Sequence, residues 1–320
     1  MIEVKNLSKQ FVVKSGLLGQ EEYVHAVNGV SFSIGDQETL GLVGESGSGK
    51  STTGRLILRL LEPTSGKILL EGKDISTISD RDFRKLRKEL QIVFQNPYSA
   101  LDYKMTVEDI LMQPLQIHKI VPPLEYKKEV HRLLHMVGLD HSSARKFPHE
   151  FSGGQRQRIG IARALATKPR FIVCDEPVSA LDVSVQSQIL NLTMDLQKEL
   201  GISYLFIAHD LHVIKHVSDR VAVMYLGKIV EMGEAEGVFE NPMHPYTKAL
   251  LAAVPGQGEE AQIERRRLKG EIPSAIRMPS GCSFHTRCPF AMEICRNEIP
   301  ILKEYKNRMV SCHLLDKEGV

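Results

Sequence analysis

The sequence predicts an α/β fold in which a sheet with parallel strands carries a glycine-rich loop. Two short apolar runs, at residues 171–174 and 204–208, are typical of buried parallel strands. Between them, apolar residues recur at the spacing of a helix face that packs on a core, namely Val185, Ile189, Leu192, Leu196 and Leu200. A glycine-rich segment at 44–49 follows a third strand-like run and opens a helical pattern. Because alternating strands and helices build α/β sheets, these observations favour that class.

The segments on either side of the glycine-rich loop have the alternating pattern of β-strands. We expect strands at 2–6, 26–34, 38–43 and 66–70. Residues 15–22 are rich in glycine and are expected to form a surface hairpin loop. A helical pattern begins at Lys50, continues through Leu61 and stops at Pro63. These elements predict an antiparallel β subdomain beside the α/β core.

Residues 96–155 predict a helical lobe inserted into the core. The helical pattern there is interrupted by prolines at 114, 122, 123 and 148, where we expect it to break. A polar stretch at 256–271 predicts a linker within the last part of the chain. We therefore divide the chain into residues 1–238, which hold the core and its lobe, and residues 239–320, a small cysteine-rich extension.

Composition and charge argue against several functional classes. The chain has 320 residues, with 41 Lys and Arg against 39 Asp and Glu, which leaves a net charge of +2. This balance disfavours a large nucleic-acid-binding surface and an acidic solvating tail. No apolar run approaches the roughly 18 residues of a membrane span, and the first residues lack the apolar core of a signal peptide. We expect a cytosolic protein with no nucleic-acid partner.

The most specific local pattern is the phosphate-binding loop G-x-x-x-x-G-K-S, which residues 44–51 match. Glycines let successive backbone N–H groups surround a phosphate, and the helix that follows adds partial positive charge. Lys50 is expected to bind the β- and γ-phosphate oxygens, and Ser51 to hold Mg²⁺. The expected nucleotide contacts are Gly44, Glu45, Ser46, Gly47, Ser48, Gly49, Lys50, Ser51 and Thr52.

Two adjacent acids, Asp175 and Glu176, end the apolar run that begins at Phe171. A parallel strand delivers such residues to the carboxyl edge of its sheet, where phosphate-binding loops also lie. We expect Asp175 to hold Mg²⁺, directly or through water. We expect Glu176 to orient and polarise the water that attacks the γ-phosphate. The pair predicts hydrolysis of the bound nucleotide rather than binding alone.

The segment Phe151-Ser152-Gly153-Gly154-Gln155 has the pattern of a helix start. Ser152 is a good N-cap, Gln155 completes a capping box, and the two glycines leave the helix end open to a phosphate. The segment resembles the LSGGQ signature of ABC-type ATPases, with Phe in the first place. In that family this helix end faces the γ-phosphate bound by the partner subunit. The resemblance therefore implies a nucleotide sandwiched in a dimer.

Further residues follow the order of the ABC-type motifs. Gln95 resembles the Q-loop glutamine, which links the Mg²⁺ site to the helical lobe. Asp182 resembles the D-loop aspartate, and His209 the switch histidine that contacts the γ-phosphate. For the aromatic residue that stacks on adenine, spacing favours Phe11, while the insertion at 15–22 makes Tyr23 a competitor. The resemblance thus assigns catalytic roles to Glu176, His209 and Lys50.

The C-terminal part resembles the extension of ATPase subunits in oligopeptide and dipeptide importers, and the residues around Gln95 resemble the OppF/DppF type in particular. The segment His244-Pro245-Tyr246-Thr247 carries this resemblance, together with a cysteine-containing tail. Four thiols in a short cytosolic segment indicate a metal rather than disulfides. Their spacing, C-x5-C-x6-C-x16-C, matches neither zinc pairs nor ferredoxin runs. The four are Cys282, Cys288, Cys295 and Cys312.

The resemblance implies an iron–sulfur cluster bound by these thiols, because some members of the family carry a [4Fe–4S] cluster in this tail. Zinc and free thiols are the alternatives. The chain is identified as a member of the peptide-importer ATPases, with ATP and Mg²⁺ as cofactors. The implied partners are a paralogous ATPase, two membrane permease subunits and an extracytoplasmic peptide-binding protein. The implied location is the cytoplasmic face of the membrane.

Two other functions remain open on the sequence. Importers of nickel, glutathione or antimicrobial peptides use ATPases of the same kind, and no residue of this chain encodes the cargo. A soluble ABC ATPase in DNA repair or translation is the alternative from another class. Repair members insert a long coiled coil between the two phosphate-site motifs, and ribosomal members carry two motif sets. This chain has a single compact set.

Overall fold

The computed structural model describes residues 1–15, 20–253 and 271–317. The chain forms two compact units, the first comprising Met1–Ser33, Leu40–Ser76 and Ala208–Val320, and the second Ile34–Thr39 and Thr77–Ile207. Half of the predicted hairpin loop, residues 16–19, and nearly all of the predicted linker lie outside the described residues. The predicted domain division at residue 238 follows motifs rather than compactness and stays a prediction.

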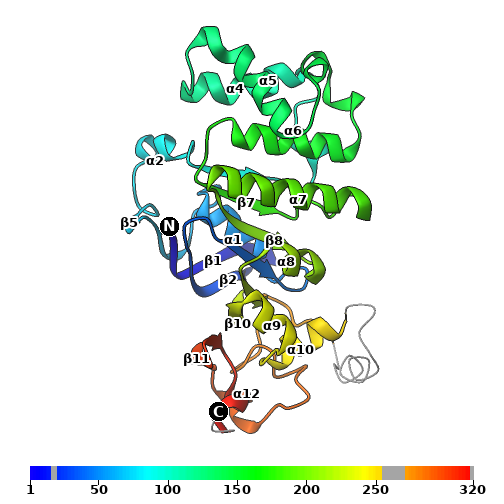
Figure 1. Cartoon of the computed structure of the whole chain (residues 1–320). Helices are drawn as coiled ribbons and strands as arrows, with labels where there is room; N and C mark the ends of the chain where they lie inside the picture. The colour runs from blue at the N-terminus through cyan, green and yellow to red at the C-terminus, as the bar shows by residue number, and fades with distance from the viewer. Residues whose placement is uncertain (16–19, 254–270, 318–320) are drawn as a thin grey trace. The chain divides into compact units, whose positions relative to one another are not determined.

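The first unit contains a four-stranded sheet in the order β2-β1-β4-β5, and Figure 1 labels β1, β2 and β5 of these strands. Its strands are β1 (Ile2–Ser15), β2 (Gln20–Ile34), β4 (Ser65–Leu70) and β5 (Lys73–Asp74). β1 pairs antiparallel with β4 in a register that sets Ile2 opposite Leu70 and Val4 opposite Ile68. All four side chains are buried, because alternate residues of a strand share a face. The predicted antiparallel subdomain is confirmed.

A second group of strands in the first unit runs in the order β3-β9-β10-β12-β11. They are β3 (Thr39–Val43), β9 (Arg220–Tyr225), β10 (Lys228–Glu234), β11 (Lys303–Tyr305) and β12 (Arg308–Val310). β3 and β9 are parallel, and the remaining neighbours are antiparallel. The sequence pattern did not indicate β11 and β12. They add the C-terminal extension to the sheet by pairing Val310 with Glu231 of β10.

The helices of the first unit are short. In its described residues they are α1 (Lys50–Ile57), α8 (Leu211–Val217), α9 (Ala235–Glu240), α10 (Pro245–Ala252), α12 (Glu293–Asn297) and α13 (His313–Lys317). The helix predicted to continue from Lys50 through Leu61 ends at Ile57, before Pro63 is reached. No helix in the described ranges combines the length and the apolar character that crossing a membrane requires.

The second unit contains parallel strands in the order β8-β7-β6. They are β6 (Leu90–Val93), β7 (Phe171–Asp175) and β8 (Ser203–Ala208). Every residue of β7 and β8 is buried, as the two apolar runs predicted. The register sets Val93 opposite Cys174, so the carboxyl ends of β6 and β7 are neighbours. This pairing determines which side chains meet at that edge.

Helix α7 (Val183–Leu200) follows β7 and has the predicted apolar stripe only in part. Ile189 and Leu196 are buried, whereas Leu200 is 40 % exposed. The helix ends at Leu200, because Gly201 takes a left-handed conformation with φ of 64°. The last predicted core position therefore lies at the end of the helix and faces solvent.

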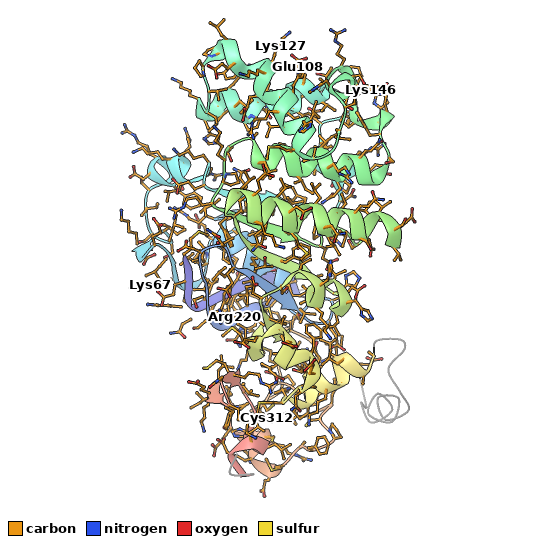
Figure 2. All side chains as sticks on the ribbon, viewed as in Figure 1. Lys67, Glu108, Lys127, Lys146, Arg220 and Cys312 are labelled. Carbon is orange, nitrogen blue, oxygen red and sulfur yellow. The ribbon has the colours of Figure 1, made fainter. Side chains whose placement is uncertain are left out.

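Residues 96–155, the segment of the predicted lobe, contain helices joined by loops. The lobe contains α3 (Pro97–Ala100), α4 (Val107–His118), η1 (Pro123–Glu125), α5 (Tyr126–Met136), η2 (His141–Arg145), η3 (Pro148–Glu150) and the start of α6 (Gly153–Leu165). Helices α4, α5 and α6 pack on one another (Figure 1). Figure 2 labels Glu108 on α4 and Lys127 on α5, whose charged groups lie 3.6 Å apart. Helix α2 (Asp80–Leu86) precedes the lobe.

The expected break at Pro114 does not occur, because α4 runs through this residue. A proline inside a helix removes one backbone hydrogen bond and costs about 3 kcal/mol. Leu111 and Leu115, on either side of it, are completely buried. The helix also starts with a capping box in which Thr106 and Asp109 bond reciprocally. Packing and capping together offset the cost that the sequence pattern alone indicated.

Candidate nucleotide-binding site

The phosphate-binding loop lies between β3 and α1 in the first unit. Two of its glycines are required by close backbone approaches. Gly49 has φ of 102°, and a Cβ there would lie 2.1 Å from the Ala26 carbonyl oxygen. A Cβ on Gly44 would lie 2.1 Å from the Met224 carbonyl oxygen. Any larger residue at either position would displace the loop.

Lys50 folds back over this loop. Its Nζ donates to the carbonyl oxygens of Gly44, at 2.8 Å, and Glu45, at 2.9 Å. The residue is only 5 % exposed. In α1, all of which is described, the first turn carries no acidic side chain. An open helix N-terminus with a fixed ammonium group beside it suits the phosphates of a nucleotide.

The remaining loop residues differ in exposure. Ser46 and Gly47 are exposed at the tip, Ser48 is buried, and Ser51 and Thr52 are half-buried in the first turn of α1. Ser51 is the loop residue whose hydroxyl could hold Mg²⁺, since oxygen ligands suit this cation.

The acidic pair lies in the second unit, at the end of β7. Asp175 is 3 % exposed, and Glu176 follows it in a left-handed conformation with φ of 48°. The Glu176 amide donates to the Ile207 carbonyl oxygen at 2.9 Å, and its own carbonyl oxygen accepts from Ser179 Oγ at 3.1 Å. These bonds hold a backbone conformation that is unfavourable for a residue with a side chain.

Gln95 and Glu176 meet at this edge. Gln95 Nε2 donates to Glu176 Oε2 at 2.8 Å. Gln95 comes shortly after β6, and β6 is the parallel neighbour of β7, so both residues follow strands that end side by side. The structure therefore brings together two of the predicted site residues. In this arrangement Gln95 binds a carboxylate rather than acting only as a possible metal ligand.

The predicted capping box at the start of α6 is confirmed. The Gln155 amide donates to Ser152 Oγ at 3.4 Å, and the Ser152 amide donates to Gln155 Oε1 at 3.1 Å. Both residues are exposed, as is Asp182 at the start of α7. Gly154 has a packing role that the sequence did not reveal, because a Cβ there would lie 2.4 Å from Val185 Cγ1 of α7.

The other predicted contacts lie in the first unit. His209 follows β8 and is exposed. Phe11 on β1 has the Lys9 ammonium 5.2 Å from its ring centroid, and Tyr23 on β2 is 44 % exposed. The choice between these two aromatic residues stays open.

The loop residue Glu45 contacts the C-terminal extension, which the sequence pattern did not indicate. Glu45 forms two hydrogen bonds with Arg287 and one with Tyr246, both in the C-terminal extension. The hydrogen bonds with Glu45 raise the pKa of Arg287 above its ordinary value, so this guanidinium stays charged. The only signal in the sequence was the resemblance around His244, which marked the extension but gave no contact.

The four C-terminal cysteines line one pocket, together with His244, His285 and His313. Figure 2 labels Cys312, the last of the four along the chain. Burial raises the pKa of Cys288 to about 11 and that of Cys312 to about 12, so both are protonated as they stand. Among the described residues, no three His, Cys, Asp or Glu side chains are placed to hold a metal ion. The thiols share a pocket without forming a metal site, and the predicted cluster stays a prediction.

The fifth cysteine, Cys174, is buried in β7, and burial raises the pKa of its thiol. It packs as a small apolar residue of the core and takes no part in thiolate chemistry.

Comparison with known proteins agrees with this geometry. Residues 27–179 match the ABC transporter family model, and residues 230–295 match that of the oligopeptide/dipeptide transporter C-terminal region. The chain is 29 % identical to the ATP-binding cassette MJ0796, solved as a dimer in a post-hydrolysis state with ADP and phosphate. That likeness covers 73 % of this chain and 99 % of the other, with a TM-score of 0.65. The fold and the motifs define an ABC-type ATPase.

Two relatives show which type of ABC ATPase this chain is. The chain is 50 % identical over 319 residues to the oligopeptide transport ATP-binding protein AppF of Bacillus subtilis, covering 98 % of this chain and 97 % of that protein. It is 44 % identical over 313 residues to the di/tripeptide transport ATP-binding protein DppF of Pseudomonas aeruginosa, covering 98 % and 97 %. The chain belongs to the family of ATP-binding subunits of oligopeptide/dipeptide ABC transporters. This membership favours a transport role over one in DNA repair or translation.

Proposed function

We propose that the chain binds MgATP at residues 44–51 and uses its hydrolysis to power import of oligopeptides and dipeptides. The observation that carries the hydrolytic chemistry is the 2.8 Å hydrogen bond from Gln95 to Glu176. An amide donor fixes one carboxylate oxygen and leaves the other to accept a proton from an attacking water. The family membership supports the cargo class.

Each remaining residue has a distinct task in this proposal. Lys50 and the loop amides bind the phosphate oxygens, and His209 contacts the γ-phosphate. Ser51, Asp175 and Gln95 are the residues that would hold Mg²⁺, which neutralises charge on the phosphates when it is bound. Glu176 orients the water and takes up its proton. Either Phe11 or Tyr23 stacks on adenine.

The variant Glu176→Gln tests this assignment. It removes the proton acceptor while keeping the shape of the side chain and an acceptor oxygen for Gln95. We expect MgATP affinity to be retained and kcat to fall by about 10²-fold or more. Glu199→Gln, an exposed carboxylate on α7, is the control and should hydrolyse ATP at the wild-type rate. Undiminished hydrolysis by Glu176→Gln would contradict the assignment.

We further propose that two ATPase subunits enclose the nucleotide. The exposed residues Ser152, Gln155 and Asp182, with Gly153 and Gly154 between the first two, are suited to contact a nucleotide held by a second subunit. The dimeric cassette among the structural relatives supports this arrangement. The partners would be a paralogous ATPase, two membrane permease subunits and an extracytoplasmic peptide-binding protein. The chain would then lie at the cytoplasmic face of the membrane.

Size measurement in solution tests the dimer. We expect the Glu176→Gln variant to dimerise on addition of MgATP, with itself or with the co-expressed paralogue, and to remain monomeric with MgADP. A Ser152→Arg change should block this dimerisation without weakening MgATP binding to the monomer, because the bulky cation occupies the helix end. Dimers that form without nucleotide and that persist in the Ser152→Arg variant would contradict the proposed nucleotide-enclosing dimer.

We also propose a [4Fe–4S] cluster for the cysteine pocket. Four thiols that line one pocket support it, and deprotonation of the thiols and adjustment of their positions would have to accompany assembly. Protein purified without oxygen should be brown and contain four iron and four sulfide per chain. Cys288→Ser should lower both contents. Stoichiometric zinc, or a metal-free protein from the same preparation, would contradict the proposal.

The cargo is tested in cells or in reconstituted vesicles. With its permease and binding-protein partners, the chain should support uptake of labelled di-, tri- and longer peptides. The Glu176→Gln variant should abolish this uptake. Uptake of nickel or glutathione without any uptake of peptides would contradict the peptide cargo and would indicate a related class of importer.

A further inference from the structure

Glu45, the second residue of the phosphate loop, is held by the C-terminal extension. Its backbone N–H donates to Tyr246 Oη at 2.9 Å. Its carboxylate accepts from Arg287 twice, at 2.8 Å from Nη1 and 3.0 Å from Nη2. Its carbonyl oxygen accepts from Lys50 Nζ. One loop residue thus joins the phosphate-binding lysine to side chains that lie 201 and 242 positions away in the sequence.

Arg287 occupies an enclosed setting. The residue is 8 % exposed, and the Glu45 side chain is 25 % exposed. The guanidinium carbon lies 5.8 Å from the Tyr225 ring centroid, and Nη1 lies 3.5 Å from Tyr225 Oη. Tyr225 packs in turn against Tyr246, with ring centroids 4.6 Å apart. An arginine–carboxylate pair with two hydrogen bonds, packed against the Tyr225 ring, has a fixed geometry. It is stronger than an exposed ion pair.

The charge of Glu45 matters for phosphate binding. It is the single acidic residue among residues 44–51, which otherwise offer backbone N–H groups and the Lys50 ammonium. An uncompensated carboxylate in this loop would repel a polyphosphate, and the effect is large where water is partly excluded. Arg287 offsets that charge and holds the carboxylate against the extension.

The arginine lies in the same segment as the cysteine pocket. Arg287 directly precedes Cys288, which lines the pocket. Phe284 also lines it and packs edge-on against Tyr225 with ring centroids 5.3 Å apart. The segment that supplies the counter-charge for the phosphate loop is therefore the one that bears the thiols.

We propose that Arg287 is a positioning residue of the ATP site, which sets the affinity of the phosphate loop for MgATP by neutralising and holding Glu45. The extension is thereby a working part of the nucleotide site as well as a mark of the family. This inference rests on the ATP-binding role proposed for residues 44–51.

The test compares Arg287→Met, Glu45→Gln and the double variant with the wild type, by calorimetric titration with MgATP. Methionine keeps an apolar stem on Tyr225 and removes the charge. We expect Arg287→Met to weaken MgATP binding about tenfold. The double variant should bind nearly as tightly as the wild type, because the repelling carboxylate is then gone as well.

Arg277→Met is the matched control. Arg277 lies in the same extension, its side chain is 86 % exposed, and it pairs loosely with Glu22 at 3.6 Å. Its loss should leave MgATP affinity unchanged. Where Arg287→Met does not fold, Arg287→Gln takes its place, alone and combined with Glu45→Gln.

The outcomes separate a positioning role from a structural one. A lowered melting temperature with unchanged MgATP affinity would overturn the inference. So would a loss of affinity that Glu45→Gln does not restore. Absence of MgATP binding to the wild-type chain would count instead against the proposed function of the loop.

Discussion

Gln95 Nε2 lies 2.8 Å from Glu176 Oε2, although 81 positions separate the two residues. The contact arises because each residue follows a strand of a parallel pair, β6 for Gln95 and β7 for Glu176. It joins the start of the helical lobe to the carboxylate that we assign to hydrolysis. A displacement of the lobe that moves Gln95 would therefore release Glu176 from its donor.

This relationship predicts the effect of Gln95→Ala. Loss of the amide donor leaves Glu176 less well oriented, so we expect kcat for ATP hydrolysis to fall about tenfold or more while KM changes little. Steady-state kinetics with saturating Mg²⁺ measures both constants. Gln91→Ala is the control, since Gln91 lies on β6 and its side chain donates to the nearby Arg87 carbonyl oxygen. Equal kinetics for the two variants would show that the Glu176 contact is dispensable.

The packing of α6 on α7 makes Gly154→Ala destabilising. The new Cβ would lie 2.4 Å from Val185 Cγ1, so the Val185 side chain or the two helices must shift. We expect the free energy of unfolding to fall by about 1–3 kcal/mol, as measured by denaturant titration. A second change, Val185→Ala, should recover much of the loss.

The control for this prediction is Gly160→Ala on the same helix. Among the described atoms, nothing lies within 4 Å of a Cβ built at Gly160. Alanine there should stabilise the helix by up to about 1 kcal/mol. Similar destabilisation by the two alanine variants would indicate a propensity effect rather than the contact with Val185.

Buried His244 predicts an acid-sensitive link between the core and the extension. Burial lowers the pKa of His244 to about 3 from an ordinary 6.5. Its Nδ1 accepts from the Tyr246 amide, and its own amide donates to the Glu231 carboxylate, which lies inside the fold. Between pH 6.5 and about 3 the unfolded chain binds a proton that the folded chain does not. Because of this residue, the free energy of unfolding decreases by up to about 1.4 kcal/mol for each pH unit by which the pH falls.

The variant His244→Asn checks this pH dependence. Asparagine can still accept from the Tyr246 amide as an N-cap, but it does not titrate. The fall in unfolding free energy from pH 6.5 towards pH 4 should be shallower in the variant than in the wild type. His149→Asn, at an exposed histidine in the helical lobe, should keep the wild-type slope. A wild-type slope in His244→Asn would refute the role of His244.

Local patterns predicted much of this molecule. The strands at 171–175 and 203–208 follow from uninterrupted apolar runs, and the capping box at Ser152 follows from residue identity and spacing. Patterns failed where packing outweighs intrinsic preference. Pro114 lies inside α4 because its neighbours are buried, and Leu200 is exposed because the helix ends there.

The sequence by itself determined the class of fold, the family and the residues of the phosphate loop and the acidic pair, because each of these depends on residues close together in the chain. The tertiary structure decided which of those residues meet. The register of β6 with β7 brings Gln95 to Glu176, and the pairing of β12 with β10 joins the extension to the sheet of the first unit. Within that unit Arg287 reaches Glu45 from a distance of 242 positions. Such contacts depend on where separate elements pack, and the spacing of residues along the sequence does not indicate this.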